Sequence, residues 1–143
     1  MSDLKVTIDT NVLLVSISDR SRYHLIYRAF LNGIYTLCVT GDILDEYEEI
    51  FEQPHHLGPT ITQDVLEVID NAPNVALVTK FFRWELIKND PDDNKFVDCA
   101  VACNADFIVT NDRHFTILKG IPFPRLQVIN IDEFIDILKS FHQ

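Results

Sequence analysis

Short and almost continuous apolar runs alternate with longer amphipathic stretches along this chain. The apolar runs predict five strands, one around Val6 and Ile8 and the others over residues 35–39, 75–78, 107–110 and 126–129. Because successive residues in these runs are apolar, the strands are expected to be buried on both faces. The pattern therefore predicts an α/β fold in which helices cover a parallel sheet.

The stretches between the apolar runs predict helices. A helix is expected to open at Asp9-Thr10-Asn11, with apolar residues continuing at helical spacing until Gly33 ends it. Further helices are expected from Thr40 or Asp42 to residue 51, and over residues 62–69, 94–103 and about 132–141. No repeat, linker or low-complexity segment interrupts the pattern, so residues 1–143 are expected to form a single domain.

The charge balance limits which partners the protein can bind. Twelve Lys and Arg stand against 22 Asp and Glu, and the formal net charge is −10. This balance argues against a broad basic face that binds phosphates. If the protein handles nucleic acid, a metal ion or a local basic strip must supply the positive potential.

The cysteines and the N-terminus bear on the cellular compartment. Cys38, Cys99 and Cys103 are odd in number and include no C-x-x-C pair. Cys99 and Cys103 lie four residues apart in an apolar run, which favours small buried side chains over zinc ligands. The N-terminus lacks a secretory signal, and no apolar stretch approaches the roughly 18 residues that span a bilayer. A cytoplasmic protein without a membrane segment is expected.

Acidic residues recur near the ends of the predicted strands. Asp9 follows the first strand and Asp112 ends the fourth, while Asp93 opens the helix that leads back into the fourth strand. Glu46 lies about one turn into the helix after the second strand. Ligands bind at the carboxyl ends of strands in open α/β sheets, and clustered carboxylates require a counter-ion. Hard oxygen ligands of this kind suit Mg²⁺ or Mn²⁺, which can activate water for phosphodiester hydrolysis.

Each acid also has a purely structural interpretation. Asp9 could only cap the first helix, because Asp-Thr-Asn is good capping chemistry. Asp90 and Asp92 compete with Asp93 for its position, and whether either assists it stays open. Asp112 could be a turn residue.

The structural interpretation of Glu46 is different: its helix is rich in acids, and Glu46 could simply belong to a solvated face of that helix. At helical spacing Glu46 shares a face with Ile43 and Ile50, whereas Glu48 shares another with Leu44. Glu46 is therefore the acid expected to point inward.

Three motifs together resemble the PIN domain family. They are D-T-N after the first strand (residues 9–11), D-P-D-D-N-K-F before a helix (residues 90–96) and I-V-T-N-D at the end of a strand (residues 108–112). The sequence looks most like the bacterial subfamily described as toxin components of toxin–antitoxin modules, from about residue 4 to residue 138. The resemblance implies a Rossmann-like three-layer α/β/α sandwich with a central parallel sheet of about five strands.

The same resemblance implies a metal-dependent endoribonuclease. The four acids of the family fall on the residues expected to be both catalytic and ligands of Mg²⁺ or Mn²⁺: Asp9, Glu46, Asp93 and Asp112. Thr10, Asn11 and Thr110 match the polar residues that support the first and last acids. The implied partners are an RNA substrate, an antitoxin protein and, in a homodimer, a second copy of the chain.

Two other classes of function stay open. A receiver-like signalling module would bind Mg²⁺ through its acids and accept a phosphoryl group on an Asp, but it needs a basic residue at the tip of a late strand. Here the fifth strand ends in Asn130, and Asp132 follows. A non-catalytic domain of the same fold would bind RNA or a protein, and the acidity favours a basic protein over non-specific RNA.

The histidines and glycines add less. His114 follows Asp112 by two residues and is a candidate for facing the substrate, whereas His55-His56 in a Pro-flanked loop is typical of an inert exposed pair. The four glycines are too widely spaced for a phosphate-binding loop, which argues against a dinucleotide cofactor.

Overall fold

Five parallel strands form the central sheet, in the order β3-β2-β1-β4-β5. The computed structural model describes residues 4–79, 85, 87, 93–120 and 126–141. The strands are β1 (Lys5–Ile8), β2 (Thr36–Val39), β3 (Val75–Leu77), β4 (Phe107–Val109) and β5 (Val128–Ile129). Strand β1 is central: Val6 pairs with Leu37 of β2 on one side and with Phe107 of β4 on the other. The predicted five-stranded parallel sheet is confirmed.

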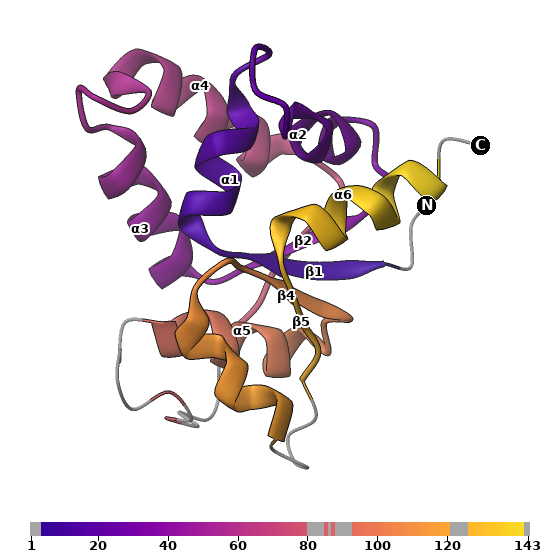
Figure 1. Ribbon diagram of the computed structural model, residues 1–143. Coiled ribbons are helices and arrows are strands. Elements are labelled where there is room, and N and C mark those ends of the chain that lie inside the picture. Colours follow the sequence, from indigo (N-terminus) through magenta and orange to yellow (C-terminus); the bar gives the residue numbers. More distant parts are fainter. Residues whose placement is uncertain (1–3, 80–84, 86, 88–92, 121–125, 142–143) are drawn as a thin grey trace.

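Helices lie on both sides of this sheet. They are α1 (Thr10–Ile17), α2 (His24–Leu31), α3 (Gly41–Phe51), α4 (Gly58–Asn71), α5 (Asn94–Cys103), α6 (Ile131–Ser140) and the 3-10 helix η2 (Arg113–Gly120). In Figure 1, α1, α2 and α6 lie above the edge-on sheet, whereas α5 lies below it. The expected α/β/α layering is therefore confirmed. None of the helices in the described part of the chain is both long and apolar enough to cross a membrane.

Buried aromatic side chains tie the upper helices to the sheet. Tyr35, next to β2, is completely buried, and its ring meets that of Phe134 on α6 edge-on at 5.3 Å. Its hydroxyl donates a hydrogen bond to the carbonyl of Ile26 on α2, at 2.9 Å. Each buried aromatic ring contributes a large apolar area, so these contacts fix α2 and α6 on the sheet.

Three helical segments differ from the sequence-based expectation. The single helix expected after Asp9 is two helices, because the chain turns at the polar residues 18–23, where the Ser21 hydroxyl accepts a hydrogen bond from the Tyr23 amide. Helix α4 begins at Gly58, four residues before the predicted start, and Pro59 suits its first turn. No element was predicted for Arg113–Gly120, which forms η2 around the buried Phe115 and Leu118.

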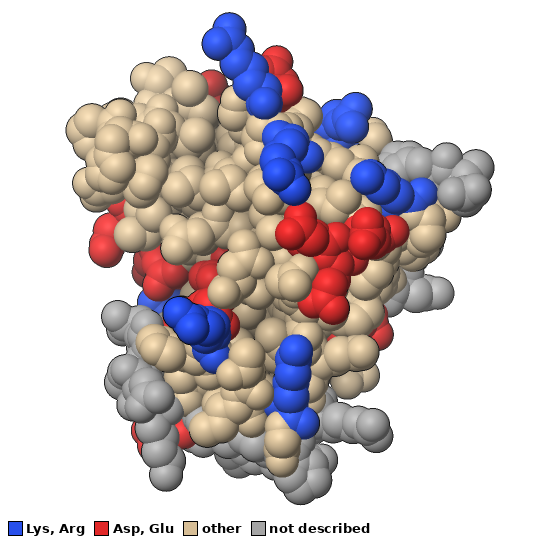
Figure 2. Space-filling model, in the orientation of Figure 1, with Lys and Arg blue, Asp and Glu red and all other residues tan. Residues whose placement is uncertain are grey.

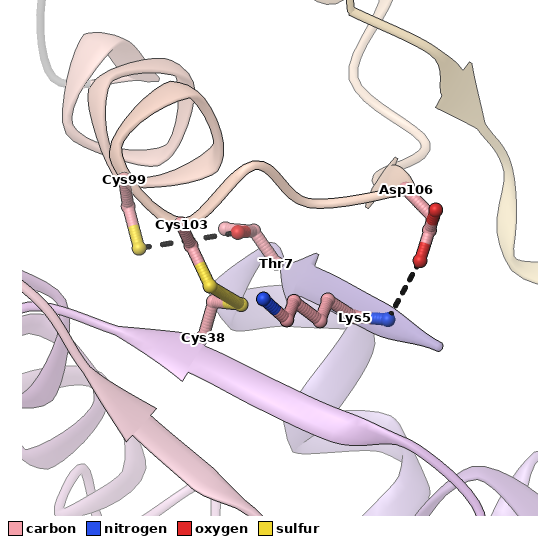
Figure 3. Close-up of a disulfide and its surroundings, with 6 residues drawn as sticks. All are labelled: Lys5, Thr7, Cys38, Cys99, Cys103 and Asp106. Carbon is pink, nitrogen blue, oxygen red and sulfur yellow. Dashed lines mark hydrogen bonds between the residues drawn. A yellow bond between two sulfur atoms is a disulfide. The ribbon is translucent and has the colours of Figure 1, made fainter. Parts of the chain in front are cut away.

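A disulfide joins Cys38 of β2 to Cys103 at the end of α5, with 6.4 Å between their Cα atoms. Figure 3 shows this bond between α5 and the sheet, beside Thr7 of β1. Cys99 is buried and takes no part in this disulfide, and its sulfur accepts a hydrogen bond from the Thr7 hydroxyl at 3.9 Å. The expected burial of Cys99 and Cys103 is confirmed, whereas the pairing with Cys38 was not predicted. All of these contacts hold α5 against β1 and β2.

Candidate active site

The four predicted acids come from four segments that meet at the carboxyl end of the sheet. Asp9 lies between β1 and α1, and Asp112 lies between β4 and η2. Glu46 is in the second turn of α3, and Asp93 immediately precedes α5. In Figure 1 this end of the sheet is at the left, where β1 passes into α1. A parallel sheet brings these segments together because all of its strands end on the same side.

Asp9 is held by hydrogen bonds and surrounded by other acids. Its Oδ2 accepts a hydrogen bond from the Thr110 hydroxyl at 2.8 Å, and its amide donates to the Val109 carbonyl at 3.0 Å. Burial raises the pKa of the Asp9 carboxyl, and the negative charges of Glu46 and Asp112 raise it further, whereas the hydrogen bonds from Thr110 and Thr10 lower it. The local structure therefore works against a bare carboxylate at this position, which a cation would stabilise.

Glu46 is fixed by two partners, one on each carboxylate oxygen. The hydroxyl of Thr10 on α1 donates a hydrogen bond to Oε2. The ammonium of Lys95 on α5 lies 2.7 Å from Oε1. The next residue, Tyr47, donates its hydroxyl to the Ile8 carbonyl at 2.6 Å, which anchors α3 on the end of β1. Glu46 thus points into the site, on the inward face predicted for it.

Thr110 and Asn111 organise the end of β4. The Thr110 hydroxyl donates to Asp9, as described above, and also accepts a hydrogen bond from the Asp112 amide at 3.0 Å. One hydroxyl therefore links the first acid to the backbone of the last. The Asn111 side chain accepts a hydrogen bond from the Ile131 amide at 3.0 Å and so ties this segment to the start of α6.

Asp93, Asp112 and His114 form the group best suited to hold a cation. One ligand atom from each residue lies within 4.8 Å of the others. His114 Nδ1 is 3.4 Å from Asp112 Oδ1 and 3.7 Å from Asp93 Oδ2. Two carboxylates and an imidazole are common ligands of divalent ions. The donor set therefore fits a divalent cation.

The structure bears on several of the alternatives raised by the sequence. Neither Asp9 nor Asp93 makes a side-chain capping bond to the helix that it precedes. Asp90 and Asp92 lie outside the described residues, and so does the first part of the motif that contains them. Asn11 is exposed on α1, and none of the hydrogen bonds described above involves it.

Lys95 and His114 are neighbours of the acids that the sequence-based prediction did not place among the site residues. Lys95 belongs to the D-P-D-D-N-K-F motif, and its position two residues after Asp93 is the feature of the sequence that points to it. His114, expected as a candidate for facing the substrate, lies against two of the acids, and its role toward a substrate stays a prediction.

A hollow of about 370 Å³ lies beside Asp112. Thr110 and Asp112 line it at the end of β4, Arg113 and Lys119 of η2 bring positive charge to it, and Asp132 and Glu133 of α6 bring negative charge. On the left of Figure 2, Asp and Glu side chains gather at the edge of the molecule with Lys or Arg side chains next to them. The strongly acidic chain thus places bases locally around its acidic end.

Comparison with known proteins identifies a family. Residues 5–114, more than half of the chain, match the family model of the PIN domain. No curated protein matches the sequence.

Three solved structures share the fold. VapBC2 from Rickettsia felis, bound to a DNA fragment from their promoter, is 17% identical with a TM-score of 0.61, and the match covers 89% of this chain and 98% of that one. FitAB bound to an IR36 DNA fragment is 12% identical, with a TM-score of 0.51 and coverage of 88% and 94%. FitAcB from Neisseria gonorrhoeae is 12% identical, with a TM-score of 0.54 and coverage of 88% and 97%.

Proposed function

The chain belongs to the PIN domain family, and from this premise we propose that it is a metal-dependent endoribonuclease that cleaves RNA phosphodiester bonds with a metal-activated water. Asp9, Glu46, Asp93 and Asp112 are the proposed catalytic acids and metal ligands. Thr10 and Thr110 hold Glu46 and Asp9 in place, and Asn11 is proposed to support the same group.

One observation carries this proposal. Acids from four separate segments meet at one end of the sheet, although burial and the charges of Glu46 and Asp112 raise the pKa of Asp9 and disfavour its charged form. Folding alone gives no reason to bury Asp9 beside two further acids, because their charges oppose its ionisation. A carboxyl group whose pKa is perturbed by neighbouring acids is typical of functional sites, and a divalent cation would offset the repulsion between these acids.

The chemistry divides between the cation and the side chains. When bound, Mg²⁺ or Mn²⁺ would polarise a phosphate oxygen and lower the pKa of water. Asp93 and Asp112 would hold the ion, with Asp9 close by, since its pKa responds to the charge of Asp112. Lys95 and Arg113 carry the positive charges that would attract the phosphates of the RNA. Glu46 keeps Lys95 in position through its 2.7 Å contact.

The proposed biological role is that of the toxin in a toxin–antitoxin module. The resemblance of the sequence motifs to that subfamily supports this role, and the fold shared with VapBC2 and FitAB agrees with it. The role implies an antitoxin protein as a partner, RNA in the cytoplasm as the substrate and a homodimer as the assembly. Arrest of growth on expression of the wild type, but not of Asp9→Asn, would support it, and normal growth with both would oppose it.

The nuclease proposal is tested by incubating the protein with a single-stranded and a structured RNA in Mg²⁺ or Mn²⁺. We expect cleavage that stops in EDTA and falls by at least about a hundred-fold in Asp9→Asn and Asp112→Asn. Asp64→Asn, an exposed acid on α4, is the matched control and should cleave like the wild type. Cleavage that persists in EDTA and in both site variants would come from a contaminant or from other chemistry, and would overturn the proposal.

A further inference from the structure

We propose that His114 is a direct ligand of the divalent ion, through Nδ1, and that it makes the site select Mn²⁺ over Mg²⁺. The inference rests on the proposed function for the presence of an ion, and it goes further by adding an imidazole to the carboxylates and by naming the class of ion.

The spacing of the three side chains suits a single ion. Two ligands of one transition ion lie about 3 to 4 Å apart when each bond is about 2.1 Å long. His114 Nδ1 is 3.4 Å from an oxygen of Asp112 and 3.7 Å from an oxygen of Asp93, so both spacings fall in that range. The side chains are 13%, 31% and 42% exposed for Asp93, Asp112 and His114, so the imidazole lies on the side from which an ion would enter.

The surrounding structure fixes the imidazole in this position. The His114 amide donates to Asp112 Oδ1 at 2.9 Å, and the Phe115 amide donates to the Asp112 carbonyl at 3.2 Å. Phe115 is completely buried and anchors the first turn of η2 in the core. His114 is therefore held against Asp112 by its own backbone.

Asp93 is positioned on the opposite side by a separate clamp. Asn94, the next residue, exchanges two hydrogen bonds with the backbone of Ile87, at 2.9 and 2.8 Å. Ile87 is itself buried. Because both sides are fixed before any ion arrives, little ordering is needed for the three ligands to bind together.

The donor chemistry decides which ion is favoured. Glu46 can offer an ion only the remaining lone pairs of its oxygens, because Thr10 donates to one oxygen and Lys95 to the other. Imidazole is a good ligand for transition ions, whereas Mg²⁺ prefers oxygen ligands and retains its waters. Adding the His114 imidazole to the carboxylates therefore shifts the preference of the site from Mg²⁺ towards Mn²⁺.

The test measures ion binding directly, without RNA. The affinity for Mn²⁺ is obtained from the electron paramagnetic resonance signal of free Mn²⁺, and the affinity for Mg²⁺ from its competition with Mn²⁺. We expect His114→Ala to bind Mn²⁺ at least about ten-fold more weakly, with a much smaller change for Mg²⁺. His55→Ala, in the exposed loop before α4, is the control and should bind like the wild type.

A spectroscopic measurement on the same samples identifies the ligand. Electron spin echo modulation of bound Mn²⁺ should show coupling to an imidazole nitrogen in the wild type and in His55→Ala, and none in His114→Ala. An unchanged Mn²⁺ affinity in His114→Ala, or coupling that survives in it, would overturn the inference.

The outcomes separate this inference from the proposed function. If Asp93→Asn loses the ion while His114→Ala keeps it unchanged, only the role of His114 fails, and the histidine is an ion-pair partner of the acids. If the wild type binds neither Mn²⁺ nor Mg²⁺, the proposed metal-dependent function fails together with the inference.

Discussion

The Lys95 ammonium lies 2.7 Å from the Glu46 carboxylate, so a positive charge is built into the group of acids. Both side chains are about four-fifths buried, and they connect α5 to α3. The pair crosses from one side of the sheet to the other at the carboxyl ends of the strands. Lys95 thereby partly neutralises the acids in the absence of an ion.

Replacing Lys95 by Met should destabilise the ion-free protein and increase its response to metal. The loss of a charge-assisted hydrogen bond corresponds to about 1 to 3 kcal/mol, or about 3 to 10 °C in Tm. Because the added ion restores a positive charge, Mn²⁺ should raise the Tm of Lys95→Met more than that of the wild type. Thermal unfolding in EDTA and in Mn²⁺ measures both effects. Lys139→Met, in the last turn of α6, should change neither, and equal responses of Lys95→Met and the wild type would contradict the prediction.

Asp9→Asn should be inactive and yet more stable than the wild type in EDTA at pH 7. The raised pKa means that the folded protein holds the Asp9 proton at a pH where the unfolded chain has released it. Stability is therefore lost as the pH rises from about 4, the ordinary pKa of Asp, towards the folded pKa. Asn has no such loss and can still accept the hydrogen bond from Thr110.

Urea unfolding of the wild type and Asp9→Asn at pH 3.5 and at pH 7 tests this predicted difference in stability. The two free energies of unfolding should be close at pH 3.5, and the variant should be the more stable one at pH 7. A wild type that is more stable than Asp9→Asn at pH 7 in EDTA would show that the ionised Asp9 does not destabilise the folded protein.

Tyr47→Phe should reduce the fall in the free energy of unfolding that occurs as the pH rises above about 10. Burial raises the pKa of Tyr47 well above 10, and burial likewise raises that of Tyr35. Between the ordinary pKa of about 10 and the folded pKa, only the unfolded chain releases the proton, so stability falls as the pH rises above about 10. At pH 7 the variant should lose about 1 to 3 kcal/mol, because the Ile8 carbonyl loses its hydrogen-bond donor.

Denaturant curves at pH 7, 10 and 11 measure both effects. The double variant Tyr35→Phe/Tyr47→Phe should be flatter still than the single one. If the free energy of unfolding fell equally in the wild type and in Tyr47→Phe between pH 10 and pH 11, the raised pKa of Tyr47 could not be the cause of the fall.

Reduction of the Cys38–Cys103 disulfide should lower the free energy of unfolding without removing the fold. The two cysteines are 65 residues apart, and opening a loop of that length corresponds to at most about 4 kcal/mol of chain entropy. Denaturation with and without a reductant measures the difference. The double variant Cys38→Ala/Cys103→Ala should be insensitive to reductant, whereas Cys99→Ala should remain sensitive. Alkylation of three thiols in the unreduced, unfolded protein would contradict the pairing.

The sequence was most informative where the physical signal is local. Continuous apolar runs such as residues 107–110 marked the strands, and polar residues directly after them marked the end of the sheet where the acids meet. The inward direction of Glu46 followed from its spacing to Ile43 and Ile50 on one helix.

Contacts between distant segments could not be predicted in this way. Lys95 and Glu46 are 49 residues apart, and their contact depends on how α5 and α3 lie across the sheet. His114 meets Asp93 only because η2 turns back after β4, and no periodic pattern indicated η2. Cys38 could be paired with Cys103 rather than Cys99 only once the position of α5 was known.

Strand β1 is synthesised first and completes its pairing late. Its neighbour β4 follows about a hundred residues further along, and the hydrogen bond from Thr110 to Asp9 spans 101 residues. A chain still on the ribosome that has exposed only Asp9 and Glu46 therefore lacks half of the acids and the hydroxyl that positions the first one. The proposed active site therefore stays incomplete until β4 has emerged from the ribosome. Because the order of synthesis delays its assembly, the proposed nuclease could not cleave the messenger RNA that encodes it before that point.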